Sequence, residues 1–298
     1  MLLGEADCPY TLRFMFDIRP LVPSRENIAE TAQFLRLVWP KAHHITAAYL
    51  DWEYNRNPCG PAFGFNAFRN GEMMAHCVVQ PLEARLHGEV RRGVLSLNAA
   101  THPDARGQGL YFDLVQRTYA EAAEVGYEFG IAVTNHRSTA GFVKHVGFEC
   151  LSPLDVRIGL GLPRRRANAS TPEFEKHWTA ELLAWRLANP SVSYRIVRKE
   201  PGDRSLVCGP TGMPGVETIM GAFADSSLPD GFNSRSRGVN PFRLWAGFDP
   251  AVDWRRSLYF PIPMALRPSP LNFIFKEMGR GKPTPGQIRL TPIDFDNF

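Results

Sequence analysis

The chain has 298 residues, of which 44% are hydrophobic and 21% are charged, and its formal net charge is +4. Such a composition is typical of a soluble globular protein with one large domain or two smaller ones. The charge is too small to favour a nucleic-acid-binding protein, although it suits an anionic ligand. The five cysteines are widely spaced and include no Cys-x-x-Cys. The sequence therefore predicts neither disulfides nor a metal site, and we expect a cytoplasmic protein without a signal peptide or a membrane span.

The first part of the chain is predicted to alternate strands and helices. Ser24 is a suitable N-cap for a helix that ends at Pro40, and Asn70-Gly71 is typical of a type I′ hairpin turn. The other expected elements are a strand at 10–18, a helix at 45–54, hairpin strands at 63–69 and 72–80, a strand to 86 and, after a turn at 87–88, a strand to 100. This order predicts an α/β fold in which helices cover both faces of a mixed sheet.

The most informative segment is a glycine-containing turn at residues 102–111, which lies between the apolar run 94–100 and a helical pattern that ends before Gly126. A strand that passes through such a turn into a helix presents unpaired backbone N–H groups and the positive end of the helix dipole to an anion. Gly107 and Gly109 allow the backbone to approach that anion closely. A glycine pair also serves ordinary turns, so the interpretation depends on the segments that follow.

The segments after this turn strengthen the phosphate-binding interpretation. Residues 127–133 are predicted to form a buried strand, which is followed by a polar turn and a helix. Two motifs stand in this order of elements: Pro103-x-x-Arg106-Gly107-x-Gly109-Leu110, and Asn135-x-x-Ser138 through Lys144-x-x-Gly147-Phe148. Together they resemble the GNAT superfamily of acyl-CoA N-acyltransferases. The resemblance extends over about residues 10–162 and implies a GNAT-like fold with acetyl-CoA or another acyl-CoA as acyl donor.

The resemblance implies a set of cofactor-binding residues. Amides of the turn would hold the pyrophosphate of CoA, and Arg106 would support the turn or a phosphate oxygen. The pantetheine arm would pair with the backbone after residue 98, because its amides need partners once they leave water. Asn135 would bond the arm from the facing strand, and the N–H of Ala100 or Thr101 would stabilise the carbonyl oxygen during transfer. The implied residues are Ala99, Ala100, Thr101, Arg106, Gly107, Gln108, Gly109, Leu110, Tyr111, Phe112 and Asn135.

The catalytic groups are less evident, because the sequence departs from the family pattern. Tyr111 stands where the turn usually has a small residue, and the frequent tyrosine acid is missing: the count from Asn135 gives Phe142, and the count back from Gly147 gives Val143. The strand before the turn has no glutamate, and its polar residues are Ser96 and Asn98. Asn98 could hold a water that removes the proton of the acceptor, and His76 could act as the base if its ring faces the cleft. Both are also compatible with ordinary hydrogen-bonded strand positions.

The C-terminal part is predicted to be a second unit. Residues 162–170, which include the basic run 164–166, have the composition of a solvated linker. A helix is expected from Thr171, with Phe174, Trp178, Leu182 and Trp185 on one face, and another helix at 271–278. Residues 185–190 weakly repeat residues 52–58. We therefore expect two tandem GNAT-like units: an acyl-CoA-binding catalytic domain at 1–162 and a degenerate domain at 171–298.

The sequence thus favours an N-acyltransferase that moves an acetyl or other acyl group from acyl-CoA directly to an amine of a small molecule, such as an amino sugar or an amino acid derivative. Direct transfer is expected because no cysteine has a recognisable histidine partner. One alternative is a CoA-binding module without catalysis, in keeping with the missing glutamate and tyrosine. Another is a GNAT-fold transferase that uses aminoacyl-tRNA, which the mild charge disfavours. The expected partner is a small-molecule acceptor, without nucleic acid or membrane.

Overall fold

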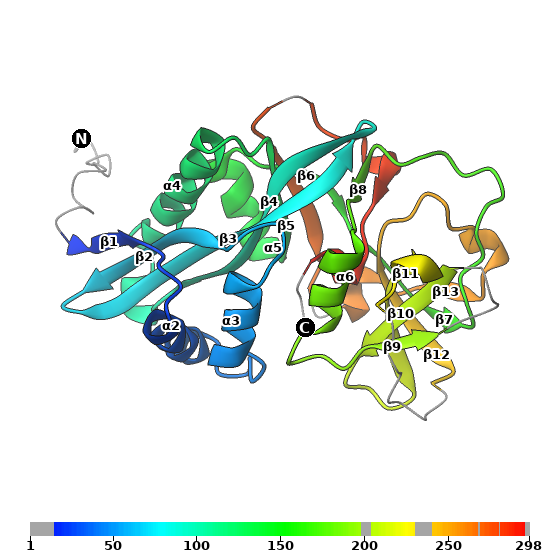
Figure 1. Ribbon diagram of the computed structural model, residues 1–298, viewed down its shortest axis with the longest axis horizontal. Coiled ribbons are helices and arrows are strands. Elements are labelled where there is room, and N and C mark those ends of the chain that lie inside the picture. Colours follow the sequence, from blue (N-terminus) through cyan, green and yellow to red (C-terminus); the bar gives the residue numbers. More distant parts are fainter. Residues whose placement is uncertain (1–14, 198–203, 230–239, 268, 280, 296–298) are drawn as a thin grey trace. The chain divides into compact units, whose positions relative to one another are not determined.

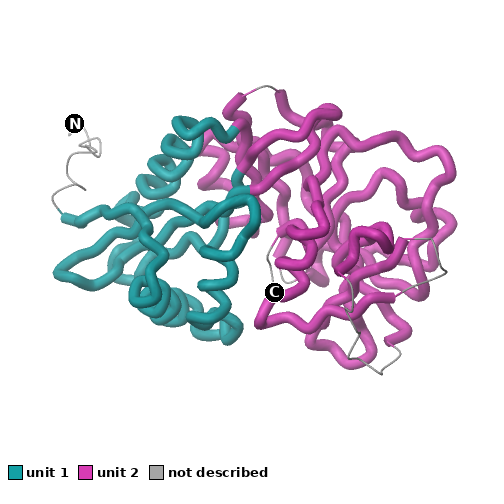
Figure 2. Tube along the Cα trace, in the orientation of Figure 1, with its two compact units in different colours: residues 1–81, 94–127 teal, residues 82–93, 128–298 magenta. Residues whose placement is uncertain are grey.

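The structure is a computed structural model that describes residues 15–197, 204–229, 240–267, 269–279 and 281–295. The chain forms two compact units, as Figure 2 shows. Unit 1 consists of residues 1–81 and 94–127, and unit 2 consists of residues 82–93 and 128–298. The units therefore do not divide at the predicted linker of residues 162–170. The origin of residues 171–298 as a second, degenerate GNAT-like domain stays a prediction.

Within the described residues, unit 1 contains one edge of a mixed sheet and the helices α2 (Arg25–Val38), α3 (Ala47–Asn55) and α4 (Leu110–Glu124) (Figure 1). Its strands, in spatial order, are β1 (Asp17–Pro20), β2 (Phe63–Arg69), and the larger parts of β3 (Glu72–Leu86) and β4 (Glu89–Thr101), whose remaining residues within 82–93 belong to unit 2. β1 and β3 both run antiparallel to β2. The predicted strand at 10–18 begins only at Asp17 within the described residues, and residues 10–14 lie outside them.

Local signals set most boundaries of unit 1. The hydroxyl of Ser24 accepts from Asn27 N at 3.3 Å at the start of α2, as predicted. Thr46 caps α3 in the same way, at 3.1 Å from Tyr49 N. Asn70 and Gly71 both have positive φ, 54° and 84°, as the predicted type I′ turn requires. The buried side chains of α4 recur at helical spacing, and this helix contacts β2.

Unit 2 contains a sheet in which the C-terminal part of the chain completes an N-terminal pair of strands. β14 (Asn272–Glu277) lies between β5 (Phe129–Thr134) and β6 (Glu149–Pro153) and runs antiparallel to both. The prediction of a helix at 271–278 is therefore wrong. Phe273, Ile274 and Phe275 are consecutive and almost fully buried, because a strand inside a sheet can bury both of its faces.

The helix predicted from Thr171 also begins elsewhere. Phe174 lies in β8 (Phe174–Lys176), which pairs with Leu86 of the β3 tip and with β15 (Ile288–Arg289). The helix that follows, α6 (Ala180–Leu187), starts at Thr179, whose hydroxyl accepts from Leu182 N at 3.1 Å. Residues 174–176 form a strand instead of the predicted helix because the Phe174 ring packs among aromatic side chains of unit 2. Its ring centroid lies 5.8 Å from the centroids of both Phe129 and Phe273.

A second sheet in unit 2 packs against α6. Its spatial order is β13 (Tyr259–Pro261), β7 (Asp155–Leu160), β12 (Phe242–Gly247), β11 (Val216–Ala224), β10 (Arg204–Pro210) and β9 (Arg195–Val197). Leu183 and Leu187 of α6 belong to one buried cluster with Val207 and Met220 of this sheet. α5 (His136–Gly141) continues into a π-helical turn at Phe142–Val146. Short 3₁₀ turns lie at Pro103–Ala105, Asp225–Ser227, Trp254–Arg256, Met264–Leu266, Pro285–Gln287 and Pro292–Asp294.

No helix in the described part of the chain has both the length and the apolar character needed to cross a membrane.

Candidate functional site

The turn between β4 and α4 depends on two glycines in unit 1. After the 3₁₀ turn Pro103–Ala105, Gly107 has a φ of 76° and Gly109 a φ of 74°. This left-handed region costs other residues roughly 1–2 kcal/mol, because their Cβ crowds the following carbonyl. Gly109 is the N-cap of α4, and because it is a glycine it has no side chain with which to cap the helix. The predicted passage from a strand through a glycine turn into a helix is therefore confirmed.

The backbone amides of residues 107–110 are suited to binding an anion. Arg106 N donates to Pro103 O at 3.3 Å, and Phe112 N donates to Gly109 O at 3.0 Å. Within the described residues, no backbone or side-chain acceptor is bonded to the amides of residues 107–110 that lie between them. Unpaired donors of this kind, at the positive end of a helix dipole, form a binding site for phosphate. The Arg106 side chain is exposed beside them.

Two polar side chains of the turn are also informative. Gln108 Nε2 donates to Asp104 O at 3.2 Å, whereas Gln108 Oε1 is buried and has no hydrogen-bond partner among the described residues. Tyr111 is partly buried, and its ring packs edge-to-face on Phe112 with centroids 5.0 Å apart. Burial raises the pKa of Tyr111 above its usual value, so the phenol stays neutral. The start of α4 thus accommodates the large residue at this position.

Asn98 interrupts the regular backbone of β4 shortly before the turn. It has a φ of 44°, in the left-handed region that asparagine tolerates better than most residues. Such a residue inside a strand re-aims the side chains and the backbone groups next to it. The segment Ala99–Thr101 follows directly, and the hydroxyl of Thr101 is buried without a partner among the described residues.

The side chain of Asn98 joins a buried carboxylate on α3. Asn98 Nδ2 donates to Glu53 Oε2 at 2.7 Å and to Tyr54 Oη at 3.1 Å. Glu53, which is 1% exposed, also accepts from the Tyr49 hydroxyl at 2.8 Å on Oε1. Because both N–H groups of the Asn98 amide are used, Asn98 Oδ1 is the atom of this side chain left to accept a hydrogen bond.

His76 lies deeper in the same network. Its Nδ1 is 2.6 Å from Asn66 Oδ1, and its Nε2 is 2.9 Å from Tyr54 Oη. Because Asn66 Oδ1 accepts only, His76 carries its proton on Nδ1 and accepts from the Tyr54 hydroxyl on Nε2. Burial lowers the pKa of His76 to about 3, and burial raises the pKa of Tyr54 well above its usual value. His76 is 1% exposed, so the condition attached to it as a candidate base, a ring that faces the cleft, is not met.

The structure thus brings Asn98 and His76 together through Tyr54, and it adds Glu53, which the sequence analysis missed. A signal for Glu53 is present in the sequence: it stands between Trp52 and Tyr54 in a short helix, four residues after Tyr49. An acid among aromatic residues on a buried helix needs hydrogen-bonding partners. The strand that supplies Asn98 is, however, 45 residues further along the chain.

Asn135 lies in unit 2, at the N-terminus of α5. Its side-chain oxygen accepts from Ser138 N at 3.0 Å and so caps that helix. The Asn135 amide nitrogen is therefore the group that could donate to a ligand. Its predicted role toward the pantetheine arm stays a prediction.

Comparisons with known proteins bear on the fold. Residues 23–151 match the family model of the acetyltransferase (GNAT) domain. A GCN5-related N-acetyltransferase from Anabaena variabilis has a similar structure, with a TM-score of 0.61 at 11% identity over 88% of this chain and 73% of that chain. The chain has the GNAT fold. No curated protein matches the sequence.

Two further solved structures share the GNAT fold with this chain. One is a conserved protein of unknown function from Enterococcus faecalis, a probable N-acyltransferase, with a TM-score of 0.56 and 11% identity over 89% of this chain and 73% of that chain. The other is Eis1 from Mycobacterium abscessus, with a TM-score of 0.55 and 14% identity over 89% of this chain and 74% of that chain. At these identities the matches show the fold alone. They do not test the prediction of tandem units.

Metal ligation has no candidate in the described part of the GNAT-fold chain, where no three His, Cys, Asp or Glu side chains gather. Among the described residues, Cys59, Cys77, Cys150 and Cys208 form no disulfide. Burial raises the pKa of Cys77 to about 12, so this thiol is not a nucleophile near neutral pH.

Proposed function

We propose that this GNAT-fold protein is an acyl-CoA-dependent N-acyltransferase whose acceptor is the amine of a small molecule. The observation that carries the proposal is the set of unpaired amides at residues 107–110, beside the exposed Arg106 and at the N-terminus of α4. These amides would donate to the pyrophosphate of the cofactor, and Arg106 would offset part of its charge. Acetyl-CoA or another acyl-CoA bound there supplies an acyl group as a thioester, which is activated toward an amine.

The end of β4 fits the rest of such a cofactor. Backbone groups of Ala99, Ala100 and Thr101 would pair with the amides of the pantetheine arm, and the buried Thr101 hydroxyl needs a polar partner. The N–H of Ala100 or Thr101 would stabilise the negative charge that develops on the carbonyl oxygen of the acyl group. Asn135 would donate from its amide nitrogen to the arm.

Asn98 would orient the attacking group. Its Oδ1 would accept a hydrogen bond from the acceptor amine, or from a water that removes the proton of that amine. Glu53 is a positioning residue in this scheme, because its carboxylate binds Asn98 Nδ2 and so keeps Oδ1 turned away from the buried network. His76, with a pKa of about 3, would hold Tyr54 and would not itself accept a proton near neutral pH.

The test measures thiol release from acetyl-CoA in the presence of a panel of amino sugars and amino acids. Asn98→Ala should lower kcat about 10- to 100-fold, with little change in the KM for acetyl-CoA, because the turn at residues 107–110 is untouched. Glu53→Leu should also lower kcat, because Asn98 Nδ2 would lose the acceptor that orients it. Asn66→Ala, at the far end of the network, is the matched control and should leave kcat within about threefold of the parent.

Three outcomes would count against the proposal. If acetyl-CoA binds but no acceptor in the panel gives turnover, the non-catalytic module becomes the better description. If acetyl-CoA does not bind, the cofactor assignment is wrong. If Asn66→Ala lowers kcat as much as Asn98→Ala does, the network is structural and Asn98 has no separate role in the reaction.

A further inference from the structure

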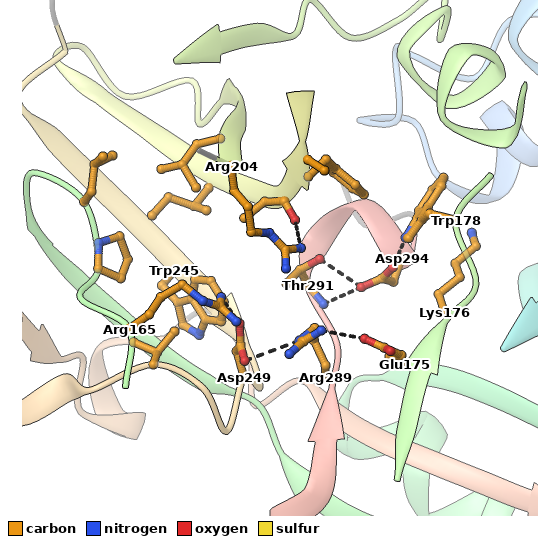
Figure 3. A pocket seen from close by; sticks show the side chains of 18 of the residues that line it. Arg165, Glu175, Lys176, Trp178, Arg204, Trp245, Asp249, Arg289, Thr291 and Asp294 are labelled. Carbon is orange, nitrogen blue, oxygen red and sulfur yellow. Dashed lines mark hydrogen bonds and ion pairs between the residues drawn. The ribbon is translucent and has the colours of Figure 1, made fainter. Parts of the chain in front are cut away.

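Unit 2 contains a cavity of about 1140 Å³ that the proposed acyl transfer does not use (Figure 3). All the residues that line it belong to unit 2, and they include residues of β8, β10, β11, β12 and β15, Arg85 of β3, and residues of the segments at 162–165, 249–256 and 291–294. Pockets for small molecules and cofactors measure about 300–1,000 Å³. The cavity is therefore large enough for a cofactor-sized ligand.

The cavity has a strongly basic wall in which arginines outnumber carboxylates. Four arginines and two acids of the wall lie together, namely Arg85, Arg165, Arg204, Arg289, Glu175 and Asp249; the other charged residues that line the cavity are Arg164, Arg256, Lys176 and Asp294. Arg289 Nη1 lies 2.5 Å from Glu175 Oε2, and Arg289 Nε lies 3.4 Å from Asp249 Oδ1. The same two acids also serve the next arginines, since Arg165 Nη1 is 3.0 Å from Asp249 Oδ2 and Arg85 Nε is 3.9 Å from Glu175 Oε1. Three of these guanidinium groups thus share two carboxylates, so arginines outnumber acids in this part of the wall.

Arg204 shows that these charges lie close enough to repel one another. Its side chain donates from the start of β10 to Ala222 O of β11, and Figure 3 shows Arg165, Arg204 and Arg289 approaching the same part of the cavity from three segments. Partial burial lowers the pKa of Arg204, and the charges of Arg165 and Arg289 lower it further, although Asp249 and Glu175 act in the opposite direction. Cations that are gathered in this way are suited to an anionic ligand.

The third acid of the cavity does not relieve this excess. Asp294 is 4% exposed, and its carboxylate accepts from Thr291 N at 2.6 Å and from Trp178 Nε1 at 2.8 Å. It also faces Lys176, whose ammonium lies 4.3 Å from the centre of the Trp178 ring. Asp294 therefore caps the turn Pro292–Asp294 and interacts with Lys176, and it does not pair with the four arginines in the described residues.

The remaining wall of the cavity is apolar and partly aromatic. Ile219, Phe223 and Trp245 line it and are between 1% and 8% exposed. An apolar wall opposite a cluster of guanidinium groups favours a ligand with an apolar body and an anionic end.

We propose that this cavity binds a phosphate monoester that has an apolar or aromatic body. A phosphate monoester carries close to two negative charges near neutral pH, which suits a wall in which arginines outnumber carboxylates. Guanidinium groups bind phosphate oxygens in a two-pronged geometry, and three of them converge on one region. A dicarboxylate of equal charge would spread that charge over two separate groups.

The test is calorimetric titration of the whole protein with 1-naphthyl phosphate, together with inorganic phosphate, 1-naphthol and phthalate as probes that lack one feature each. Arg204→Gln should weaken the binding of 1-naphthyl phosphate at least about 10-fold, because it removes a charge-assisted hydrogen bond. Arg36→Gln, at an exposed position of α2 outside the cavity, is the matched control and should retain the affinity of the parent, and Arg106→Gln reports any binding of the probe at the turn of unit 1. Arg204→Gln should keep or raise the melting temperature, since it removes a charge that its neighbours repel.

Each other outcome overturns the proposal. Equal affinity of Arg204→Gln and the parent would mean that the arginine cluster does not bind the probe. Loss of binding in Arg106→Gln alone would place the probe at the turn of unit 1. If 1-naphthol binds as tightly as 1-naphthyl phosphate, the phosphate has no role in binding. If inorganic phosphate binds as tightly, the cavity holds an adventitious ion only. If phthalate binds more tightly, the ligand is a dicarboxylate.

Discussion

A substitution at Gly107 can distinguish an effect on the proposed cofactor binding from an effect on folding. It has a φ of 76°, and a Cβ added there would meet no atom within 4 Å. Gly126, at the other end of α4, has a φ of 87° and surroundings that are equally open. Gly107→Val and Gly126→Val therefore introduce similar backbone strain. The first variant alone places a branched side chain beside the unpaired amides of residues 107–110.

The expected effects differ in kind between the two variants. A left-handed conformation costs a residue other than glycine roughly 1–2 kcal/mol, so both variants should lose about that much free energy of unfolding in urea. If the new side chain displaces the pyrophosphate from two amides, it removes two charge-assisted hydrogen bonds of about 1.5–3 kcal/mol each. Calorimetric titration should then show acetyl-CoA binding at least about 100-fold weaker in Gly107→Val and unchanged in Gly126→Val.

The same pair of variants can refute the reasoning. Equal affinity of Gly107→Val and the parent would mean that the turn does not hold the pyrophosphate. Equal losses of affinity in both variants would trace the effect to a weakened α4. Gly109→Val, at the N-cap itself, should behave like Gly107→Val, because its φ of 74° and its place before Leu110 are comparable.

Two further predictions concern stability. Because burial lowers the pKa of His76 from 6.5 to about 3, the unfolded chain binds a proton in that pH range that the folded chain does not. The free energy of unfolding should therefore fall by up to about 1.4 kcal/mol per pH unit as the pH drops through that range. Urea titrations at several pH values should show a smaller fall for His76→Gln. If the free energy of unfolding of this variant depends on pH as it does in the parent, His76 is not the source of the fall. Phe174→Ala should cost about 3–5 kcal/mol, because the ring is 0% exposed. Phe260→Ala, at a side chain that is 68% exposed, should cost less than about 0.5 kcal/mol, and equal losses in the two variants would contradict the pairing of β8.

The sequence predicted the elements of unit 1 well because their signals are local. Ser24 caps α2 through a residue three positions away, and Asn70-Gly71 turns the chain through its own backbone conformation. The turn at residues 102–111 is equally local, since its glycines and the start of α4 are adjacent. Signals of this kind act within one turn of the chain, so they can be read without knowledge of distant contacts.

The hydrogen-bond network of Asn98 and His76 could be predicted only in part, because it joins segments that are distant in the sequence. Asn98 and His76 could be singled out from strand position and side-chain chemistry. Neither their connection through Tyr54 nor the carboxylate of Glu53 follows from spacing, since α3, β3 and β4 meet only in the folded sheet. The burial that lowers the pKa of His76 likewise depends on side chains far away in the sequence.

The basic cavity was missed for a similar reason. Residues 164–166 have the composition of a solvated linker, but Arg165 contacts Asp249, which lies 84 residues further along the chain. Arg204 and Arg289 are separated in the sequence from Arg165 and from each other, so no run of basic residues marks the cluster. Charge patterns in a sequence indicate sites mainly where the charges are contiguous.

The position of β14 explains why the helix patterns failed in the C-terminal part and why the compact units do not follow the linker. β5 and β6 both belong to the segment that carries the GNAT motifs, yet the strand between them comes from residues 272–277. Without it, two neighbouring strands would expose unpaired N–H and C=O groups, which is costly for a sheet whose central residues are almost fully buried. The apolar run 273–275 therefore gains more from pairing on both sides than from forming one face of a helix. A domain limited to residues 1–162 would lack this strand, so the part of unit 2 that follows β5 depends on the C-terminal segment for its own sheet.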